Sequence, residues 1–271
     1  MGNLYGLIGK TLGHSISPKI HSLILESLNL NGFYNLFEVN NEDLKEAVIG
    51  LKALGAKGIN VTIPHKVNIM QYLDDVSEEA SKIGAINTID FKENKLVGYN
   101  TDYYGFGESL KKEKIEVHNK EAVILGTGGA SKAVFHYLLD NGINDIIFVS
   151  RIPKNTKDKL KDFKVISYED MDKLNCKDII INCTPCGMYP KVESCSVDKS
   201  ILSKFSSAVD LIYNPIETIF LREAREIGVK TVNGLYMLVA QAIASQEIWQ
   251  EMKISQEIKK HIYEVTKKYN C

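Results

Sequence analysis

Residues 122–131 read Ala-Val-Ile-Leu-Gly-Thr-Gly-Gly-Ala-Ser, an apolar run followed by a glycine-rich turn. The run predicts a buried strand over Ala122–Gly126, and the stretch Ala130–Leu139 predicts a helix. Glycines allow a tight turn and close approach to the backbone, so a pyrophosphate can rest on the free N–H groups that begin that helix. This order predicts a dinucleotide-binding unit, with Ser131 replacing the last glycine of the usual Gly-x-Gly-x-x-Gly pattern. The candidate cofactor-binding residues of the turn are Gly126, Thr127, Gly128, Gly129 and Ala130.

The next predicted strand, Asp145–Ser150, bears on which dinucleotide is bound. In such units an acidic residue roughly 20 positions after the turn usually binds the ribose 2′-hydroxyl of NAD, whereas an arginine accommodates the 2′-phosphate of NADP. Here the strand ends in Ser150 and Arg151 without a carboxylate. We therefore expect NADP rather than NAD; the alternative is that Arg151 is only a surface residue at a strand end.

Strand-like and helix-like segments alternate over most of the chain, which predicts an α/β architecture with mainly parallel sheets. A chain of 271 residues, 44% of them hydrophobic, suits two modest domains better than one large domain. The polar stretch 111–120 separates the two series of segments. The predicted strands are residues 4–9, 33–39, 58–63, 85–91, 95–99, 122–126, 145–150, 179–182, 207–211 and 229–232. The predicted helices are residues 18–28, 42–54, 100–110, 130–139, 235–250 and 255–269.

Charge and hydropathy exclude several classes of partner. The formal net charge of -1 provides no basic field to attract nucleic acid. The chain begins without a basic segment followed by an apolar stretch, and no apolar run approaches the length of a membrane span. We expect a cytoplasmic protein that binds neither nucleic acid nor membrane.

Neither the cysteines nor the histidines show the spacing of a metal site. Five cysteines, an odd number, point to a reducing compartment. Cys183 and Cys186 form a Cys-x-x-Cys pair, for which a redox or zinc role is conceivable, but no paired-knuckle spacing accompanies it and we favour structural thiols. The six histidines include no His-Glu-x-x-His spacing. No metal is expected.

The stretch Gly58–Lys66, Gly-Ile-Asn-Val-Thr-Ile-Pro-His-Lys, places polar groups at the mouth of a predicted buried strand. Pro64 is expected to end this strand and to occupy the first position of a helix, with Lys66 in the first turn. There the positive end of the helix dipole would disfavour the charged form of Lys66 and suit it to proton transfer. The alternative is that Lys66 is a solvated surface lysine.

Further polar residues lie beside predicted strand ends. Ser15 and Ser17 precede the first helix, where Ser17 is expected to be the N-cap and the two hydroxyls would form a carboxylate site. Asn87 and Asp102 show a similar placement, although Asp102 taken alone would be assigned as a helix cap. Ligands of open α/β sheets bind at the carboxyl ends of strands, so we expect these groups to converge. The converging residues are Thr62, Lys66, Asn87 and Asp102.

Together these segments resemble the shikimate dehydrogenase family over essentially the whole chain. The matching motifs are His14-Ser-Ile-Ser-Pro-Lys-Ile-His21, Asn60-Val-Thr-Ile-Pro-His-Lys66, Gly84-Ala-Ile-Asn-Thr88, Gly98-Tyr-Asn-Thr-Asp102, Gly126-Thr-Gly-Gly-Ala130, Asn182-Cys-Thr-Pro-Cys-Gly-Met188, Asp210-Leu-Ile-Tyr213 and Asn233-Gly-Leu-Tyr-Met-Leu-Val-Ala-Gln241. The resemblance implies NADP-dependent, reversible reduction of 3-dehydroshikimate to shikimate in aromatic amino-acid (chorismate) biosynthesis. It also implies a substrate-binding and catalytic α/β domain over residues 1–103, completed by C-terminal helices over 239–271 that pack back on it, and a Rossmann-like NADP-binding domain over 104–238.

The resemblance also implies individual roles. Lys66 and Asp102 would be the catalytic pair, in which Lys66 gives a proton to the ketone that is reduced and Asp102 holds Lys66 and a ring hydroxyl. The charge of Asp102 favours the ammonium form of Lys66 and opposes the helix dipole, and the sequence leaves that balance open. Residues that would contact or support the substrate are Ser15, Ser17, Asn60, Thr62, Asn87, Tyr213 and Gln241. Residues that would line the cofactor site with the glycine-rich turn are Glu78, Ser150, Arg151, Leu211 and Gly234.

The chain departs from the family after the second nucleotide strand. The family commonly reads Asn-Arg-Thr there, followed by another arginine, whereas this chain reads Ser150-Arg-Ile-Pro-Lys154, so that Lys154 or Lys157 would have to supply the second cation. One rival is an NAD-dependent quinate/shikimate dehydrogenase, which normally carries an acid at this point. Others are a non-catalytic regulator that binds nucleotide or shikimate, which should have lost Lys66 and Asp102, and a folate-type dehydrogenase, disfavoured by the serine pair. The expected partner is a small-molecule substrate, and a homodimer is left open.

Overall fold

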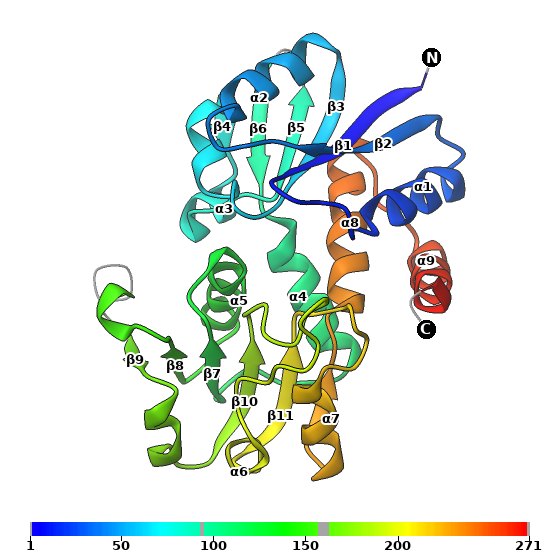
Figure 1. Cartoon of the computed structure of the whole chain (residues 1–271). Helices are drawn as coiled ribbons and strands as arrows, with labels where there is room; N and C mark the ends of the chain where they lie inside the picture. Colours follow the sequence, from blue (N-terminus) through cyan, green and yellow to red (C-terminus); the bar gives the residue numbers. More distant parts are fainter. Residues whose placement is uncertain (1, 93–94, 157–162, 270–271) are drawn as a thin grey trace. The chain divides into compact units, whose positions relative to one another are not determined.

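The structure is a computed structural model that describes residues 2–92, 95–156 and 163–269 (Figure 1). The chain divides into two compact units. Unit 1 consists of Met1–Gly105 and Val239–Tyr269, and unit 2 extends from Phe106 to Leu238. Each unit has its own six-stranded sheet with helices packed beside it, so the expected two-domain α/β class is confirmed. The chain passes between the units within α4 (Thr101–Lys112) and within α8 (Leu235–Trp249).

Unit 1 is built on a mixed sheet in the order β2-β1-β3-β5-β6-β4. Its strands are β1 (Asn3–Gly9), β2 (Gly32–Glu38), β3 (Ala56–Val61), β4 (Asp75–Val76), β5 (Thr88–Lys92) and β6 (Lys95–Tyr99). β1 pairs in parallel with β2 and β3, whereas β5 is antiparallel to β3 and to β6. β5 and β6, which are close in the sequence, thus pair as the strands of a β-hairpin do.

The helices of unit 1 pack on this sheet or on one another. They are α1 (Ser17–Ser27), α2 (Leu44–Ala53), α3 (Glu78–Ile83) and α9 (Gln256–Tyr269), with the last two-thirds of α8. Trp249 of α8 donates its indole N–H to the carbonyl of Ile89 in β5 at 3.0 Å. A Cβ on Gly58 of β3 would overlap that indole ring, so glycine is required for the contact. α8 thus packs on the first sheet and α9 packs on α1, so the C-terminal helices pack back on unit 1 as expected.

The polar residues gather at one end of the strands of this sheet. Asn60 near the end of β3 pairs with Thr88 at the start of β5, and Thr88 pairs with Tyr99 at the end of β6. Because β5 runs opposite to its neighbours, its beginning lies beside their carboxyl ends. Asn87 therefore lies at this end of the sheet because it directly precedes a strand, whereas the prediction placed it at the end of one.

Two local predictions are wrong. β3 ends at Val61, not at residue 63, and residues 63–67 form a turn before the short 3₁₀ helix η1 (Asn68–Tyr72), so Pro64 does not begin a helix. In an α-helix the carbonyl of Lys66 would accept a hydrogen bond from the N–H of the residue four positions later. Here it accepts the N–H of Ile86 at 2.9 Å instead. Similarly, Ser17 is the first residue of α1 and Ile16 occupies the N-cap position.

Unit 2 is built on a parallel sheet in the order β12-β11-β10-β7-β8-β9. Its strands are β7 (Glu121–Leu125), β8 (Asp145–Val149), β9 (Lys164–Ile166), β10 (Lys177–Asn182), β11 (Phe205–Asp210) and β12 (Lys230–Val232). Its helices include α5 (Gly129–Asp140), α6 (Lys199–Leu202) and α7 (Ile219–Glu226), with short 3₁₀ helices η2 (Pro153–Thr156) and η3 (Glu169–Lys173). Numbered within the unit, the strand order is 3-2-1-4-5-6 reversed, which is the Rossmann order. β9 was not predicted, because its three residues are too short to give a pattern.

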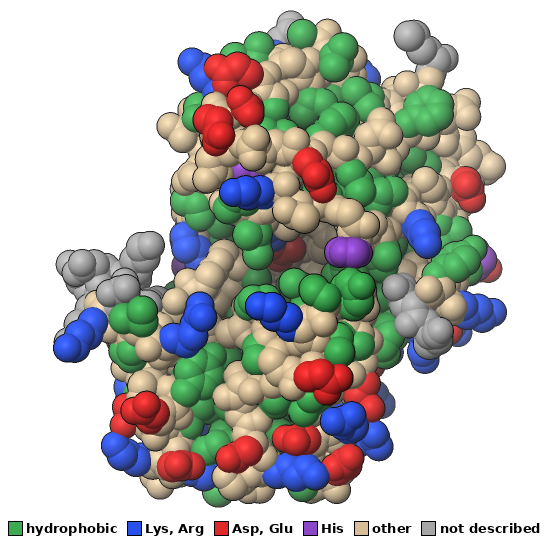
Figure 2. All heavy atoms as spheres, in the orientation of Figure 1, with side chains coloured by type: hydrophobic (Ala, Val, Ile, Leu, Met, Phe, Trp, Pro, Cys, Tyr) green, Lys and Arg blue, Asp and Glu red, His purple; other side chains and the backbone are tan. Residues whose placement is uncertain are grey.

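Side chains of both charges are interspersed on the face of the molecule that Figure 2 draws. Figure 2 shows acidic and basic side chains alternating over the visible face, with no broad area of one sign among the side chains drawn there. None of the described helices combines the length and the apolar character that a bilayer span requires.

Candidate active site

Lys66 is held in place through its backbone. It lies in the turn 63–67, which closes with a hydrogen bond from the His65 N–H to the Thr62 carbonyl at 2.9 Å. The fully buried ring of His65 ties this turn to the end of β2, with Nε2 2.8 Å from the carbonyl of Val39. The carbonyl of Lys66 accepts the Ile86 N–H from the segment before β5. The backbone of Lys66 is therefore fixed between the segment that follows β2 and the segment that precedes β5.

The Lys66 side chain ends against Asp102. Its Nζ donates a hydrogen bond to Asp102 Oδ2, and the two side chains are only 14% and 12% exposed. Asp102 lies in the first turn of α4, where the positive end of the helix dipole stabilises a carboxylate. The helix dipole therefore acts on Asp102, and the expectation that Lys66 lies in the first turn of a helix is wrong.

Asn87 fixes the second oxygen of the Asp102 carboxylate. Its Nδ2 donates to Asp102 Oδ1 at 2.9 Å, while its Oδ1 accepts the backbone N–H of Thr101 at 2.7 Å. Because the Thr101 N–H is a donor only, this contact determines which end of the amide faces Asp102. The same Nδ2 lies 3.5 Å from Oε1 of Gln241 on α8. Asp102 is thus held on one oxygen by Lys66 and on the other by Asn87.

Asn60 lies behind Asn87 and is 5% exposed. Its Oδ1 accepts the hydroxyl of Tyr34 at 2.8 Å, and its Nδ2 donates to Ser245 at 2.9 Å and Thr88 at 3.0 Å. Burial raises the pKa of Tyr34 well above its ordinary value, so this hydroxyl remains a donor at neutral pH. Protein groups occupy the whole amide of Asn60.

The serines of the loop after β1 join this network at its outer end. The Ser15 hydroxyl accepts the N–H of Ser17 at 3.3 Å, and the Ser17 hydroxyl hydrogen-bonds to Tyr34. Thr62 follows β3 directly and is half-buried, with its N–H donating to the Ile8 carbonyl of β1 at 2.9 Å. These three hydroxyls are carried by the carboxyl ends of β1 and β3, where the sequence predicted them.

In unit 2 the glycine-rich turn follows β7. Gly126 has φ +97, a conformation that favours glycine, and a Cβ there would lie 2.8 Å from Thr184 Cγ2 after β10. Gly128 is the N-cap of α5, and having no side chain it cannot cap the free N–H groups at the start of this helix. A Cβ at position 128 would meet open space. Ser131, in place of the third glycine, is buried and donates its hydroxyl to the Gly128 carbonyl at 2.7 Å. The turn lies at the β7/β10 boundary, where the strand order reverses and dinucleotides bind.

The other predicted cofactor residues of unit 2 lie on the loops that follow its strands. Ser150 and the exposed Arg151 follow β8, and Lys154 is also exposed there, whereas Lys157 lies outside the described residues. Gly234 donates its N–H to Ile212 at 2.9 Å, and a Cβ on it would overlap the Leu211 carbonyl. Glycine at position 234 therefore lets two loops touch through their backbones.

Comparison with known proteins agrees with this geometry. Residues 7–89 match the family described as "Shikimate dehydrogenase substrate binding domain". The protein "Shikimate dehydrogenase (NADP(+))" of Clostridium beijerinckii is 48% identical over 262 residues, which cover 96% of this chain and 97% of that protein. The chain belongs to the shikimate dehydrogenase family.

Two solved structures extend the match in three dimensions. A chorismate mutase/shikimate 5-dehydrogenase fusion protein from Clostridium acetobutylicum is 53% identical, with a TM-score of 0.96 over 99% of this chain and 98% of that chain. The shikimate 5-dehydrogenase of Thermus thermophilus, solved in complex with NADP(H) and shikimate, is 30% identical, with a TM-score of 0.86 over 97% of this chain and 99% of that chain. The family assignment therefore applies to both units.

The residues of unit 2 fit the cofactor of an NADP-dependent shikimate dehydrogenase. Gly128 leaves the start of α5 uncapped and sterically open, as a pyrophosphate requires. An exposed arginine follows β8, and no acidic residue accompanies it at positions 150–154. The fit holds despite the altered sequence after Arg151.

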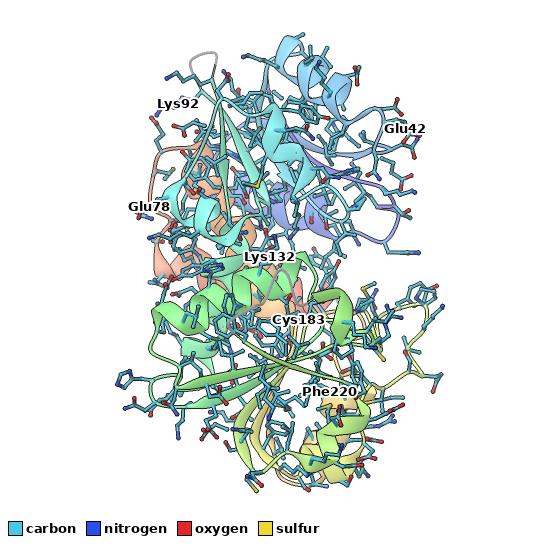
Figure 3. The ribbon with its side chains drawn as sticks, turned by 90° about the vertical axis from the view of Figure 1, so that its left-hand side faces the viewer. Glu42, Glu78, Lys92, Lys132, Cys183 and Phe220 are labelled. Atoms are coloured by element: carbon cyan, nitrogen blue, oxygen red, sulfur yellow. The ribbon has the colours of Figure 1, made fainter. Side chains whose placement is uncertain are left out.

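Not every predicted residue joins a network. Glu78, the first residue of α3, is 84% exposed, pairs with Lys82 at 2.7 Å, and lies at the edge of unit 1 in Figure 3. Tyr213 lies in unit 2, and burial raises its pKa. The hydrogen-bonded group in unit 1 comprises Ser15, Ser17, Asn60, Asn87, Asp102, Lys66 and Gln241.

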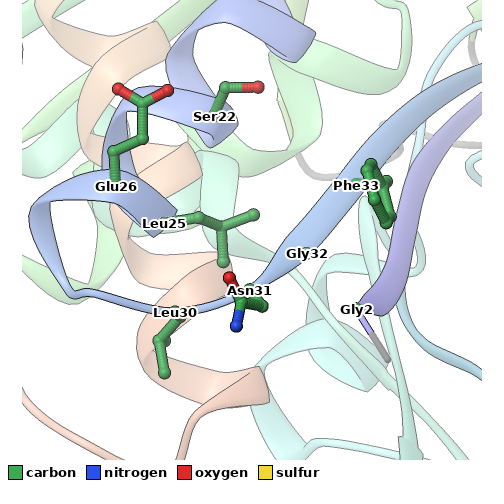
Figure 4. A pocket seen from close by; sticks show the side chains of 8 residues that line it. All are labelled: Gly2, Ser22, Leu25, Glu26, Leu30, Asn31, Gly32 and Phe33. Carbon is green, nitrogen blue, oxygen red and sulfur yellow. The ribbon is translucent and has the colours of Figure 1, made fainter.

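One surface hollow of unit 1 lies away from these residues. Figure 4 shows it between α1 and the start of β2, lined by Leu25, Glu26, Leu30 and Phe33 among others. It contains none of the predicted site residues. Its lining combines three apolar side chains with those of Ser22, Glu26 and Asn31, and Glu26 is the one ionisable group among the lining residues.

The described cysteines are free. Cys176, Cys183, Cys186 and Cys195 form no disulfide, as expected for structural thiols. Burial raises the pKa of the Cys183 thiol, which disfavours a reactive thiolate. Among the residues that the structure describes, no group of three or more His, Cys, Asp or Glu side chains could hold a metal ion.

Sequence reasoning missed four residues of the network. Tyr34, Thr88, Thr101 and Ser245 are buried and connect the predicted residues to one another. Thr88 and Thr101 stand inside matching family motifs, next to Asn87 and Asp102, which was an available signal. Ser245 lies one helical turn after Gln241, but nothing in the sequence shows that it meets residues 144 to 185 positions away.

Proposed function

We propose that this protein catalyses the NADP-dependent, reversible reduction of 3-dehydroshikimate to shikimate, in aromatic amino-acid biosynthesis. The observation that carries the proposal is the carboxylate of Asp102, held by Lys66 on one oxygen and by Asn87 on the other. A lysine that is hydrogen-bonded to one oriented carboxylate is held in one position, so it can give its proton in one direction. The identity of the substrate is inferred from the family to which the chain belongs.

The residues of unit 1 would carry the proton chemistry. Bound NADPH supplies the hydride that reduces the ketone. Lys66 would give a proton to the oxygen of that ketone, which otherwise becomes an unstable alkoxide. Asp102 would keep Lys66 aimed at this oxygen and accept a hydrogen bond from a ring hydroxyl. In the direction of oxidation, Lys66 would take the same proton back.

Substrate recognition would divide between two kinds of group. The hydroxyls of Ser15, Ser17 and Thr62 would bind the substrate carboxylate and hydroxyl groups, which suits neutral donors next to free N–H groups. Asn87 and Gln241 would bind ring hydroxyls, and the hydroxyl of Tyr213 would also contact the substrate. Asn60 would support Asn87, to whose backbone carbonyl it donates a hydrogen bond at 3.2 Å.

Unit 2 would hold NADP. The turn Gly126–Ala130 would bind the pyrophosphate through its N–H groups, and Ser150 and Arg151 would bind the 2′-phosphate. Leu211, Gly234 and Glu78 are the other residues that we assign to NADP binding. Residues 1–103 with 239–271 would accordingly form the substrate domain, and residues 104–238 the NADP domain.

The setting of the protein follows from these assignments. A soluble biosynthetic dehydrogenase with free thiols suits the cytoplasm, where thiols stay reduced. No charge pattern favours nucleic acid or a membrane surface as partner. A homodimer is the oligomer we propose to test, by light scattering at several protein concentrations.

The decisive experiment is steady-state oxidation of shikimate and of quinate, each with NADP and with NAD. We expect the highest kcat/KM for shikimate with NADP. A preference for NAD and quinate would instead support the rival quinate/shikimate dehydrogenase. Tight binding of shikimate or nucleotide without turnover in any combination would support the non-catalytic regulator and reject the proposal.

A further inference from the structure

Three buried hydroxyls lie in mutual contact behind the catalytic pair. Thr88 Oγ1 is 2.9 Å from Ser245 Oγ and 3.2 Å from Thr101 Oγ1, and Thr101 Oγ1 is 3.2 Å from Ser245 Oγ. All three residues are 0% exposed. They come from β5, α4 and α8, so the hydroxyl triad joins three elements at one point. Neither the proposed chemistry nor substrate binding accounts for it.

The neighbours of the hydroxyl triad determine the direction of its hydrogen bonds. The Nδ2 of Asn60, a donor only, points to Thr88 at 3.0 Å and to Ser245 at 2.9 Å, so both hydroxyl oxygens accept there. The backbone carbonyl of Gln241, an acceptor only, accepts a hydrogen bond from the Ser245 hydroxyl at 3.0 Å. The protons of Thr88 and Thr101 can then point at a third group.

That third group is the amide oxygen of Asn87. Thr88 Oγ1 and Thr101 Oγ1 each lie 3.1 Å from Asn87 Oδ1, and both donate to it. The opposite end of the same amide donates to Asp102 at 2.9 Å. A turned amide would place its oxygen against the Asp102 carboxylate, where two acceptors repel each other. Two hydroxyls of the triad thus join the Thr101 N–H in holding the one amide orientation that supports Asp102.

We propose that Thr88 and Ser245 are positioning residues of the reaction, which act through Asn87 to keep Asp102 aligned with Lys66. The inference rests on the proposed function, since it assigns these residues to that reaction. Neither side chain has to touch substrate for this role. Their effect is on the fraction of molecules in which Asp102 is correctly oriented, so loss of a hydroxyl lowers kcat more than it changes the KM for shikimate.

The test compares Thr88→Val, which removes the hydroxyl at nearly constant volume, with Thr88→Ser, which keeps it. We expect kcat of Thr88→Val to fall about tenfold, with the KM for shikimate changing less than about threefold. Thr88→Ser should retain kcat within about twofold of the wild-type value. The matched control is Ser109→Ala, which removes a buried helical hydroxyl that donates to the Phe106 carbonyl at 2.7 Å.

A second variant guards against misfolding. Ser245→Ala should lower kcat in the same way, and the double variant with Thr88→Val should lose no more than about twofold beyond Thr88→Val alone, because groups that act as a unit are not additive. If the wild-type protein turns over and both Thr88→Val and Ser245→Ala keep the wild-type kcat, the inference is overturned and the proposed function stays intact. Equal loss in Thr88→Ser and Thr88→Val would also overturn it. Absence of wild-type turnover would remove both.

Discussion

At the scale of single residues, Lys66 has a partner that defines its chemistry. Its ammonium is almost buried and donates to Asp102, whose other oxygen is held by Asn87. Removing the ammonium should therefore abolish proton transfer while leaving the substrate contacts of Ser15 and Ser17. We expect Lys66→Ala to lower kcat by about 10²–10⁴-fold with little change in the KM for shikimate.

The control for this substitution is Lys82→Ala. Lys82 lies in the same unit and also pairs with a carboxylate, Glu78, but its side chain is 63% exposed. Steady-state kinetics of shikimate oxidation should find Lys82→Ala unchanged. If Lys66→Ala keeps more than about a tenth of wild-type kcat, another group delivers the proton.

Arg151 allows a second test of one residue. It is exposed after β8, with no acidic residue beside it, and would pair with the extra phosphate of NADP. We expect Arg151→Ala to raise the KM for NADP about tenfold or more and to leave the KM for NAD unchanged. Arg222→Ala, an exposed arginine on α7, should change neither. An equal effect of Arg151→Ala on both dinucleotides would refute the contact.

Sequence found these two residues but gave the wrong reason for one of them. Lys66 was selected because a helix was expected to begin at Pro64, whereas its carbonyl bonds to Ile86 and no helix forms there. Residue type and motif singled out the proposed catalytic pair without the correct local geometry. Ser245 could not be found in this way, because its partners Asn60 and Thr101 are distant in the sequence and meet it only in the fold.

At the scale of elements, the β7–α5 turn uses its glycines for different purposes. Gly126 needs its positive φ, and a Cβ there would also press against Thr184, so Gly126→Ala should cost about 1–2 kcal/mol of stability. Gly128 has φ -83 and open space, so Gly128→Ala should fold normally. Its new methyl group would instead obstruct the close approach of the pyrophosphate.

These two substitutions should separate stability from binding. Urea unfolding should show a lower midpoint for Gly126→Ala only, while the KM for NADP should rise for Gly128→Ala. Equal stability losses in both variants would contradict this assignment. The turn was predictable from sequence because strand, glycines and helix are adjacent, so its geometry depends little on distant residues.

At the scale of the whole molecule, a buried ionisable group in each unit responds to acid, and the two respond in opposite directions. Burial lowers the pKa of His21 in unit 1 from 6.5 to about 3, so the unfolded chain binds the proton more readily. Burial raises the pKa of Asp210 in unit 2 from 3.8 to about 6, so the folded chain binds the proton more readily. Below pH 6.5 the first group destabilises unit 1, and below about pH 6 the second stabilises unit 2.

Acid should therefore weaken unit 1 before unit 2. Between about pH 7 and about pH 5, His21 removes about 2 kcal/mol of stability from unit 1, whereas Asp210 adds about 1 kcal/mol to unit 2. Trp249, the single tryptophan, lies 5.5 Å from the His21 ring and reports on unit 1 by fluorescence. Hydrogen exchange in β7 and β10 reports on unit 2.

We expect the urea midpoint seen by Trp249 to fall at about pH 5, and His21→Asn to abolish that fall. Asp210→Asn should remove the gain in exchange protection of unit 2. A parallel loss of stability in both units on acidification would show that other groups control the acid response.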